Sequence, residues 1–116
     1  MPAQPRRKTD PHRRAEERSI AYHRVIAERL LRNPTLLDAA RNRVRQWLDR
    51  QGPAPAYARA WDEILVQDIE AIAAALTDPG EYARELRQSS PFAGYLSPRE
   101  RWAIWRQTRD NSEPPR

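Results

Sequence analysis

Cysteine is absent from the 116-residue sequence. This absence excludes disulfide bonds, thiol catalysis and zinc sites built on thiolates, and it is consistent with a reducing compartment. No stretch approaches the ~20 consecutive apolar residues of a transmembrane helix. The first 14 residues carry charge but lack the apolar core of a signal peptide. We therefore expect a cytoplasmic protein without membrane association.

Residues that usually carry catalysis or bind cofactors are also scarce. The chain has two histidines, His12 and His23, and three scattered glycines. A metal site needs converging ligands, such as two histidines four residues apart with a carboxylate, and a phosphate-binding loop needs clustered glycines. Neither pattern is present, so we expect no catalytic residues, no metal, no cofactor and no enzymatic activity. His23 is expected to be a hydrogen-bonded histidine at a helix interface.

Lysine is nearly missing, and the positive charge is almost entirely arginine. The net charge is +5, with Lys8 as the single lysine. Arginine enrichment is typical of GC-rich bacterial genomes, but it also suits binding to nucleic acid or an acidic partner. Residues 1–19 hold six basic and three acidic side chains, whereas residues 57–85 hold two arginines and seven acids. This segregation favours two contact faces over one continuous nucleic-acid surface, unless the charges only solvate helix faces.

Helix starts of one type punctuate the chain. Asn33-Pro34, Asp78-Pro79 and Ser97-Pro98 each place a capping residue before a proline, and Asp10-Pro11 is a weaker fourth start. Asp78 with Glu81, and Ser97 with Glu100, also have the spacing of a capping box. Residues 1–12 and 111–116 contain no apolar run and are predicted to be disordered tails.

Apolar periodicity predicts an all-α fold, a small bundle of about five helices in a single domain over residues 13–110. The predicted helices span about 14–32, 34–50, 55–77, 79–88 and 98–109. The third has the clearest apolar stripe, centred on Trp61. Asp68 interrupts that stripe, and a carboxylate there must be paired or stay near solvent. We expect either a salt bridge with Arg43 or a contact with a basic partner.

The segment SSPFAGYLSPRERWAIWR, residues 89–106, concentrates aromatic and arginine side chains, which dominate binding hot spots. We expect Trp102 to enter the core and part of the rest of the segment to be available to a partner. The expected partner-binding residues are Phe92, Tyr95, Arg99, Arg101, Trp105, Arg106 and Asp68. Lower-ranked candidates for nucleic-acid binding lie in the basic tail: Arg6, Arg7, Lys8, Arg13 and Arg14.

Together with RSIAYHRVIAERL, which begins at Arg18, this segment resembles small helical proteins of GC-rich bacteria that are similar to antitoxins of toxin–antitoxin operons. Some of those proteins are encoded beside nucleotidyltransferase-like toxins. The resemblance covers about residues 18–107 and implies a non-catalytic module that binds and neutralises a partner toxin. No functional residues carry over from it. The alternatives are a homodimer and a transcriptional regulator that binds DNA through the basic tail.

Overall fold

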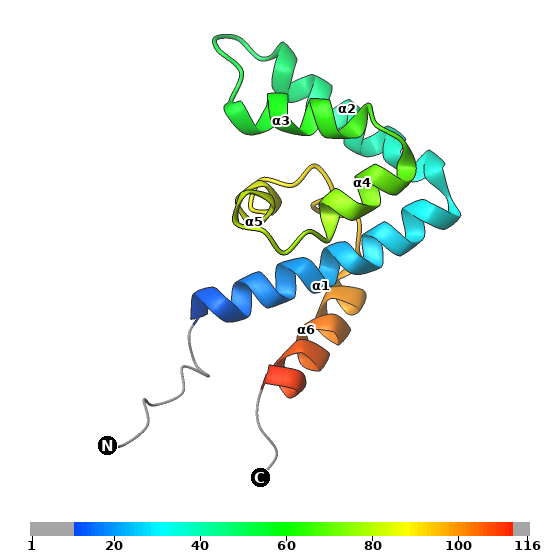
Figure 1. Ribbon diagram of the computed structural model, residues 1–116, viewed down its shortest axis with the longest axis vertical. Coiled ribbons are helices and arrows are strands. Elements are labelled where there is room, and N and C mark those ends of the chain that lie inside the picture. The colour runs from blue at the N-terminus through cyan, green and yellow to red at the C-terminus, as the bar shows by residue number, and fades with distance from the viewer. Residues whose placement is uncertain (1–10, 113–116) are drawn as a thin grey trace.

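Six α-helices and one 3-10 turn make up the computed structural model, which describes residues 11–112 and the side chains of residues 13–108 (Figure 1). This part of the chain contains no strand, so the all-α prediction is confirmed. The predicted basic tail lies almost wholly outside it. None of the helices it describes is both long and apolar enough to cross a lipid bilayer.

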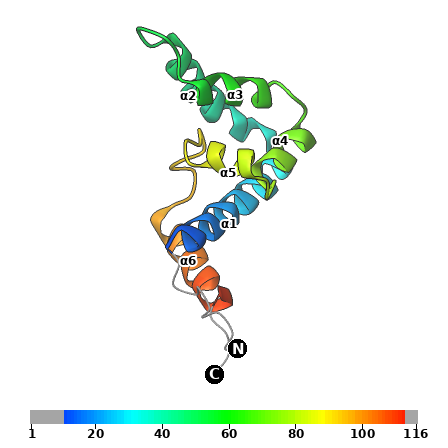
Figure 2. The ribbon, with the colours of Figure 1, turned by 60° about the vertical axis from the view of Figure 1, so that its left-hand side comes forward.

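The first helix, α1 (Pro11–Arg32), is the central element of the fold. It buries Ile26, Ala27 and Leu30 on one face, and α4, α5 and α6 all pack against it (Figures 1 and 2). The helix begins at Pro11, because proline suits a first turn whose N–H groups have no intrahelical acceptor. Residues 11 and 12 are therefore helical rather than part of the expected tail.

The next two helices form an antiparallel pair at one end of the molecule (Figure 1). A 3-10 turn, Pro34–Leu36, leads into α2 (Leu37–Asp49), which packs against α3 (Ala56–Leu65). Asn33 does not cap this start, because its side chain instead accepts a 2.5 Å hydrogen bond from the Thr35 hydroxyl. The α2–α3 connection turns at Gly52, whose φ of +86° is a conformation that favours glycine.

The single helix predicted over 55–77 is wrong, since α3 ends at Leu65 and α4 (Ile69–Leu76) starts afresh. Asp68 is the N-cap of α4, and its carboxylate accepts a 2.8 Å hydrogen bond from the Ala71 amide. The α3 end is stabilised by Arg41, which donates to the Leu65 carbonyl at 2.9 and 3.2 Å. The expected Asp68–Arg43 salt bridge is absent, because Asp68 is exposed and Arg43 donates to the Ala93 carbonyl at 2.7 Å.

A short helix, α5 (Glu81–Arg87), a loop over residues 88–97 and a final helix, α6 (Pro98–Ser112), complete the fold. The predicted capping box at Asp78 does not form. The Asp78 carboxylate accepts from the Gly80 amide at 2.7 Å in a tight turn, and Gly80 becomes the cap residue of α5. The last helix continues to Ser112, so residues 111 and 112 are also helical.

The core lies where α1, the α2–α3 pair, α4 and the 88–97 loop meet. Trp61 is its largest fully buried side chain, with 1% of its surface exposed, and its indole N–H donates to the Leu86 carbonyl at 3.2 Å. Phe92 from the loop packs edge-on against Trp61, with ring centroids 6.2 Å apart. The loop therefore forms part of the core, although it has no regular secondary structure.

Candidate binding surfaces

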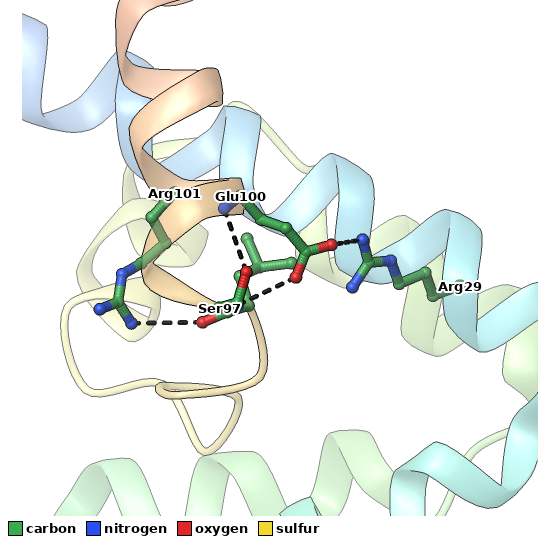
Figure 3. Close-up of polar contacts among 5 residues, drawn as sticks. Arg29, Ser97, Glu100 and Arg101 are labelled. Atoms are coloured by element: carbon green, nitrogen blue, oxygen red, sulfur yellow. Dashed lines mark hydrogen bonds and ion pairs between the residues drawn. The ribbon is translucent and has the colours of Figure 1, made fainter.

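The start of α6 is fixed to α1 by a small polar network (Figure 3). Ser97 and Glu100 form the predicted capping box: the Glu100 amide donates to the Ser97 hydroxyl at 3.1 Å, and the Ser97 amide donates to the Glu100 carboxylate at 2.9 Å. The same carboxylate forms an ion pair with Arg29 of α1. Arg101 donates to the Leu96 carbonyl at 3.4 Å. These contacts fix the rotation of α6 about its own axis.

That rotation turns Trp102 outward. Because Glu100 faces α1, Ile104, one helical turn later, faces it too and packs against the core. Trp102 lies about 160° around the helix from Ile104, at 100° per residue, and 55% of its surface is exposed. The expectation that Trp102 enters the core is therefore wrong. The core is filled from this side by Phe92 and Leu96 instead.

Trp102 and Trp105 form a stacked pair on the surface of α6. Their ring centroids are 4.8 Å apart and their planes differ by 12°. The Arg18 guanidinium of α1 lies over the Trp105 ring, with its central carbon 5.9 Å from the centroid, within the range of a cation–π contact. We call Arg18, Trp102 and Trp105 the tryptophan surface. It joins α1 and α6 and presents flat apolar area to solvent.

The structure separates the other expected partner-binding residues. Phe92 is 1% exposed and lies in the core, which does not agree with the expectation that it is free to contact a partner. Tyr95 is half-buried against Phe92 at 5.5 Å, and burial raises the pKa of its phenol, with the charge of Asp38 adding to that effect. Asp68 is exposed at the start of α4, remote in sequence from the α6 residues.

The arginines of α6 remain at the surface. Arg99, Arg101 and Arg106 are all exposed. Of the basic residues proposed for nucleic-acid binding, Arg6, Arg7 and Lys8 lie outside the described residues. Arg13 and Arg14 lie in the first turns of α1, where Arg13 pairs with Glu17 at 3.7 Å.

A pocket of about 660 Å³ lies between α1, the 88–97 loop and the α2–α3 pair, and the sequence did not predict it. Its α1 wall is one helical face, since the contributing positions recur every three to four residues. Trp47 and Tyr57, packed edge-on at 5.2 Å, face it from α2 and α3. In Figures 1 and 2 the loop runs between α1 and the α2–α3 pair. The α1 residues of the pocket are Ala15, Arg18, Ser19, Tyr22, His23 and Ile26.

The charge in this pocket has one sign. Four arginines line it, namely Arg18, Arg43, Arg87 and Arg101, and none of its lining residues is acidic. Within residues 13–108, none of the four guanidinium groups forms an ion pair with a carboxylate. Arg43 and Arg101 are exposed, whereas Arg87 is only 6% exposed. The charged side chains that line the pocket are therefore all basic, and they include both exposed and buried arginines.

Arg87 is the most unusual of these groups. It donates to the Asp78 and Leu76 carbonyls at 2.7 and 3.2 Å, and its buried Nε has no hydrogen-bond partner. Burial lowers its pKa, although the charge of Asp78 acts in the opposite direction. Because a guanidinium stays protonated in proteins, Arg87 places a permanent and incompletely compensated charge beside the pocket.

His23 fixes the loop to α1 at the edge of the same pocket. Its Nδ1 lies 2.7 Å from the Ser19 carbonyl, and its Nε2 lies 2.8 Å from the Ser90 hydroxyl. A carbonyl only accepts, so Nδ1 carries the proton and Nε2 accepts from Ser90, which in turn accepts from the Phe92 amide at 3.1 Å. Burial lowers the pKa of His23, opposed by the Ser19 hydrogen bond and reinforced by Arg87. The expected hydrogen-bonded interface histidine is confirmed.

The described part of the chain contains no group of three or more histidine, aspartate or glutamate side chains placed to hold a metal ion. No protein-family model matches this sequence, and neither a curated protein nor a solved structure is similar to it.

Proposed function

We propose that the protein is a non-catalytic interaction module that binds a partner protein through the tryptophan surface, in the manner of an antitoxin binding its toxin. The observation that carries this proposal is the stacked Trp102–Trp105 pair, held in place by the docking of α6 and left partly open to solvent. Tryptophan and arginine side chains contribute most strongly to protein interfaces when they are pre-arranged.

The charge around this surface favours an acidic partner. Arg99, Arg101 and Arg106 are exposed along α6, and Arg18 adjoins from α1. Glu100, the one acid at residues 98–108, is already paired with Arg29. An apolar partner patch with an acidic rim would therefore complement the surface in both polarity and charge. A nucleotidyltransferase-like toxin is the partner class that the sequence resemblance suggests.

The test is co-expression with the protein encoded by the adjacent gene, followed by co-purification and a growth assay. We expect the Trp102→Ala, Trp105→Ala double variant to lose at least about tenfold in partner affinity, as hot-spot tryptophans do. Its melting temperature should stay within a few degrees of wild type. Tyr82→Ala is the matched control, because Tyr82 is 66% exposed on α5 and adjoins no other aromatic residue among the described ring pairs.

Three results would argue against this function. Partner capture that survives the double variant would place the interface elsewhere. Loss of self-association, without loss of a heterologous partner, would identify the surface as a homodimer contact. Binding to the operator DNA that weakens steeply with salt would instead favour the regulator alternative.

A further inference from the structure

The pocket between α1, the 88–97 loop and the α2–α3 pair shares only Arg18 and Arg101 with the surface proposed to bind a partner, and its other lining residues have no part in that function. It is about 660 Å³, within the range of sites that hold small molecules. Its walls combine aromatic side chains with four arginines and no acid. This lining is complementary to a ligand that carries both a flat apolar group and negative charge.

We propose that this pocket binds a nucleotide, a ligand that joins an aromatic base to a phosphate through a sugar. Guanidinium groups match phosphate geometry, since their N–H donors pair with two oxygens at once. The pocket has four arginines and no acidic side chain. This is more positive charge than a ligand with a single carboxylate requires, but it suits a dianionic phosphate. Trp47 and Tyr57 supply an aromatic wall for the base.

The hydrogen bonding of the arginines supports this assignment. Arg43 uses one N–H on the Ala93 carbonyl, at 2.7 Å, and Arg101 makes only a long 3.4 Å bond to Leu96. Both are exposed at the pocket and keep further donors for an anion. Arg87, which is 6% exposed, keeps a buried Nε without a partner. A phosphate in the pocket would offset this buried charge, which no carboxylate pairs with in the free protein.

The polar groups of the 88–97 loop complete the site. Gln88, Ser89 and Ser90 also line the pocket. Ser90 is already engaged by His23 and the Phe92 amide, so it holds the loop rather than the ligand. Ser89 and Gln88 are therefore the neutral side chains of the loop placed to contact a base or a sugar.

The experiment is calorimetric titration of the full chain with AMP, with adenosine and inorganic phosphate as partial ligands. We expect saturable binding of AMP, and binding at least about tenfold weaker for each partial ligand, because each lacks one half of the recognised chemistry. Arg43→Ala and Arg101→Ala should each weaken AMP binding by about tenfold or more. Arg45→Ala is the matched control, since Arg45 is exposed on the same helix as Arg43 but does not line the pocket.

Arg87 is left intact, because removing it would also free the Leu76 and Asp78 carbonyls. Far-UV circular dichroism and melting temperature verify that each variant is folded. The indole N–H signal of Trp47 provides a second readout by NMR and should shift with AMP, whereas that of Trp102, outside the pocket, should not.

A single-stranded hexanucleotide distinguishes a free nucleotide from one within a strand. Tighter binding of the hexanucleotide, with the same sensitivity to Arg43→Ala, would identify a strand as the source of the nucleotide. Failure of both AMP and the hexanucleotide to bind, or binding unchanged by both arginine substitutions, would overturn the proposal. Neither result bears on the tryptophan surface, whose test uses different residues.

Discussion

Trp61 connects three separate parts of the core through one side chain. It lies on α3, its indole donates to the Leu86 carbonyl of α5 at 3.2 Å, and its ring contacts Phe92 of the 88–97 loop. With 1% of its surface exposed, it leaves a large cavity when truncated. We expect Trp61→Ala to lower the free energy of unfolding by ~3–5 kcal/mol, measured by chemical denaturation.

Two variants separate packing from other effects of losing Trp61. Trp61→Phe keeps a ring but loses the indole hydrogen bond to the Leu86 carbonyl, which still accepts from the Ser89 amide at 3.0 Å. Its cost should therefore be smaller but measurable. Trp102→Ala should change stability by less than about 1 kcal/mol, since Trp102 is 55% exposed. Equal losses for Trp61→Ala and Trp102→Ala would contradict the core described above.

His23 makes the stability of the fold depend on pH. Burial lowers its pKa in the folded protein below the ordinary value of about 6.5. The unfolded chain therefore takes up a proton first as the pH falls, and protonation favours unfolding. Stability is fully present above about pH 6.5 and is lost progressively as the pH falls from there towards the lowered folded pKa.

We expect the melting temperature of the wild type to fall between pH 7.5 and 5.5, and the fall to be smaller in His23→Gln. Gln retains hydrogen-bonding capacity without titrating in this range. His12→Gln, at the only other histidine of the sequence, is the control and should retain the wild-type pH dependence. A melting temperature of the wild type that rises on acidification would contradict the prediction that protonation of His23 destabilises the fold.

At the scale of elements, the α3–α4 break shows how one residue divides an apolar stripe. Asp68 caps α4 by accepting from the Ala71 amide, and it lies where the helix dipole favours a negative charge. We expect Asp68→Ala to cost about 1 kcal/mol. Asp68→Asn keeps an acceptor oxygen and should cost less, so denaturation curves of the pair isolate the cap. Identical stability for wild type and Asp68→Ala would indicate that the carboxylate does not stabilise α4.

The elements that the sequence predicts well are those whose apolar period is uninterrupted. The helix over 14–32 and the capped start at Ser97 both follow from local patterns, and the structure reproduces them. The break between α3 and α4 at residues 66–68 is not visible in the periodicity, because the residues of both helices follow the same apolar spacing. The one visible sign was Asp68 itself, a capping residue inside the stripe. Asp68 could either cap a new helix or continue the stripe of a longer one. The tertiary packing of α4 on α1 decides between these two structures.

The candidate sites were less predictable, because they depend on contacts between distant segments. Composition identifies the aromatic segment at 89–106, but the prediction that Trp102 faces the core is wrong. Trp102 and Ile104 lie on opposite sides of α6, so only one of them can face the core. In the orientation of α6 that forms the Arg29–Glu100 ion pair with α1, the residue that faces the core is Ile104. The pocket arginines come from four separate segments, so no local pattern could indicate that they meet.

At the scale of the whole molecule, α6 packs mainly on a single helix, α1. Its contacts with α1 include Ile104, the Arg29–Glu100 pair and the Arg18–Trp105 contact, while α1, α4 and the α2–α3 pair share the main core. Regions with few buried apolar contacts open locally without global unfolding. We therefore expect the amides of residues 102–108 to exchange with solvent at least about tenfold faster than the central amides of α1 and α4.

Weakening the α6 contact should widen that difference selectively. The Arg29 and Glu100 side chains are about one-third exposed, so Arg29→Ala should cost less than about 1 kcal/mol of global stability. It should nevertheless speed exchange in residues 102–108 more than in α4, because the lost contact lies between α6 and α1.

Arg32→Ala is the matched control on the same helix, since Arg32 is exposed and forms no ion pair within residues 13–108. Uniform acceleration of exchange in all helices would mean that α6 unfolds only with the rest of the molecule. In that case the tryptophan surface would be as rigid as the core on which it lies.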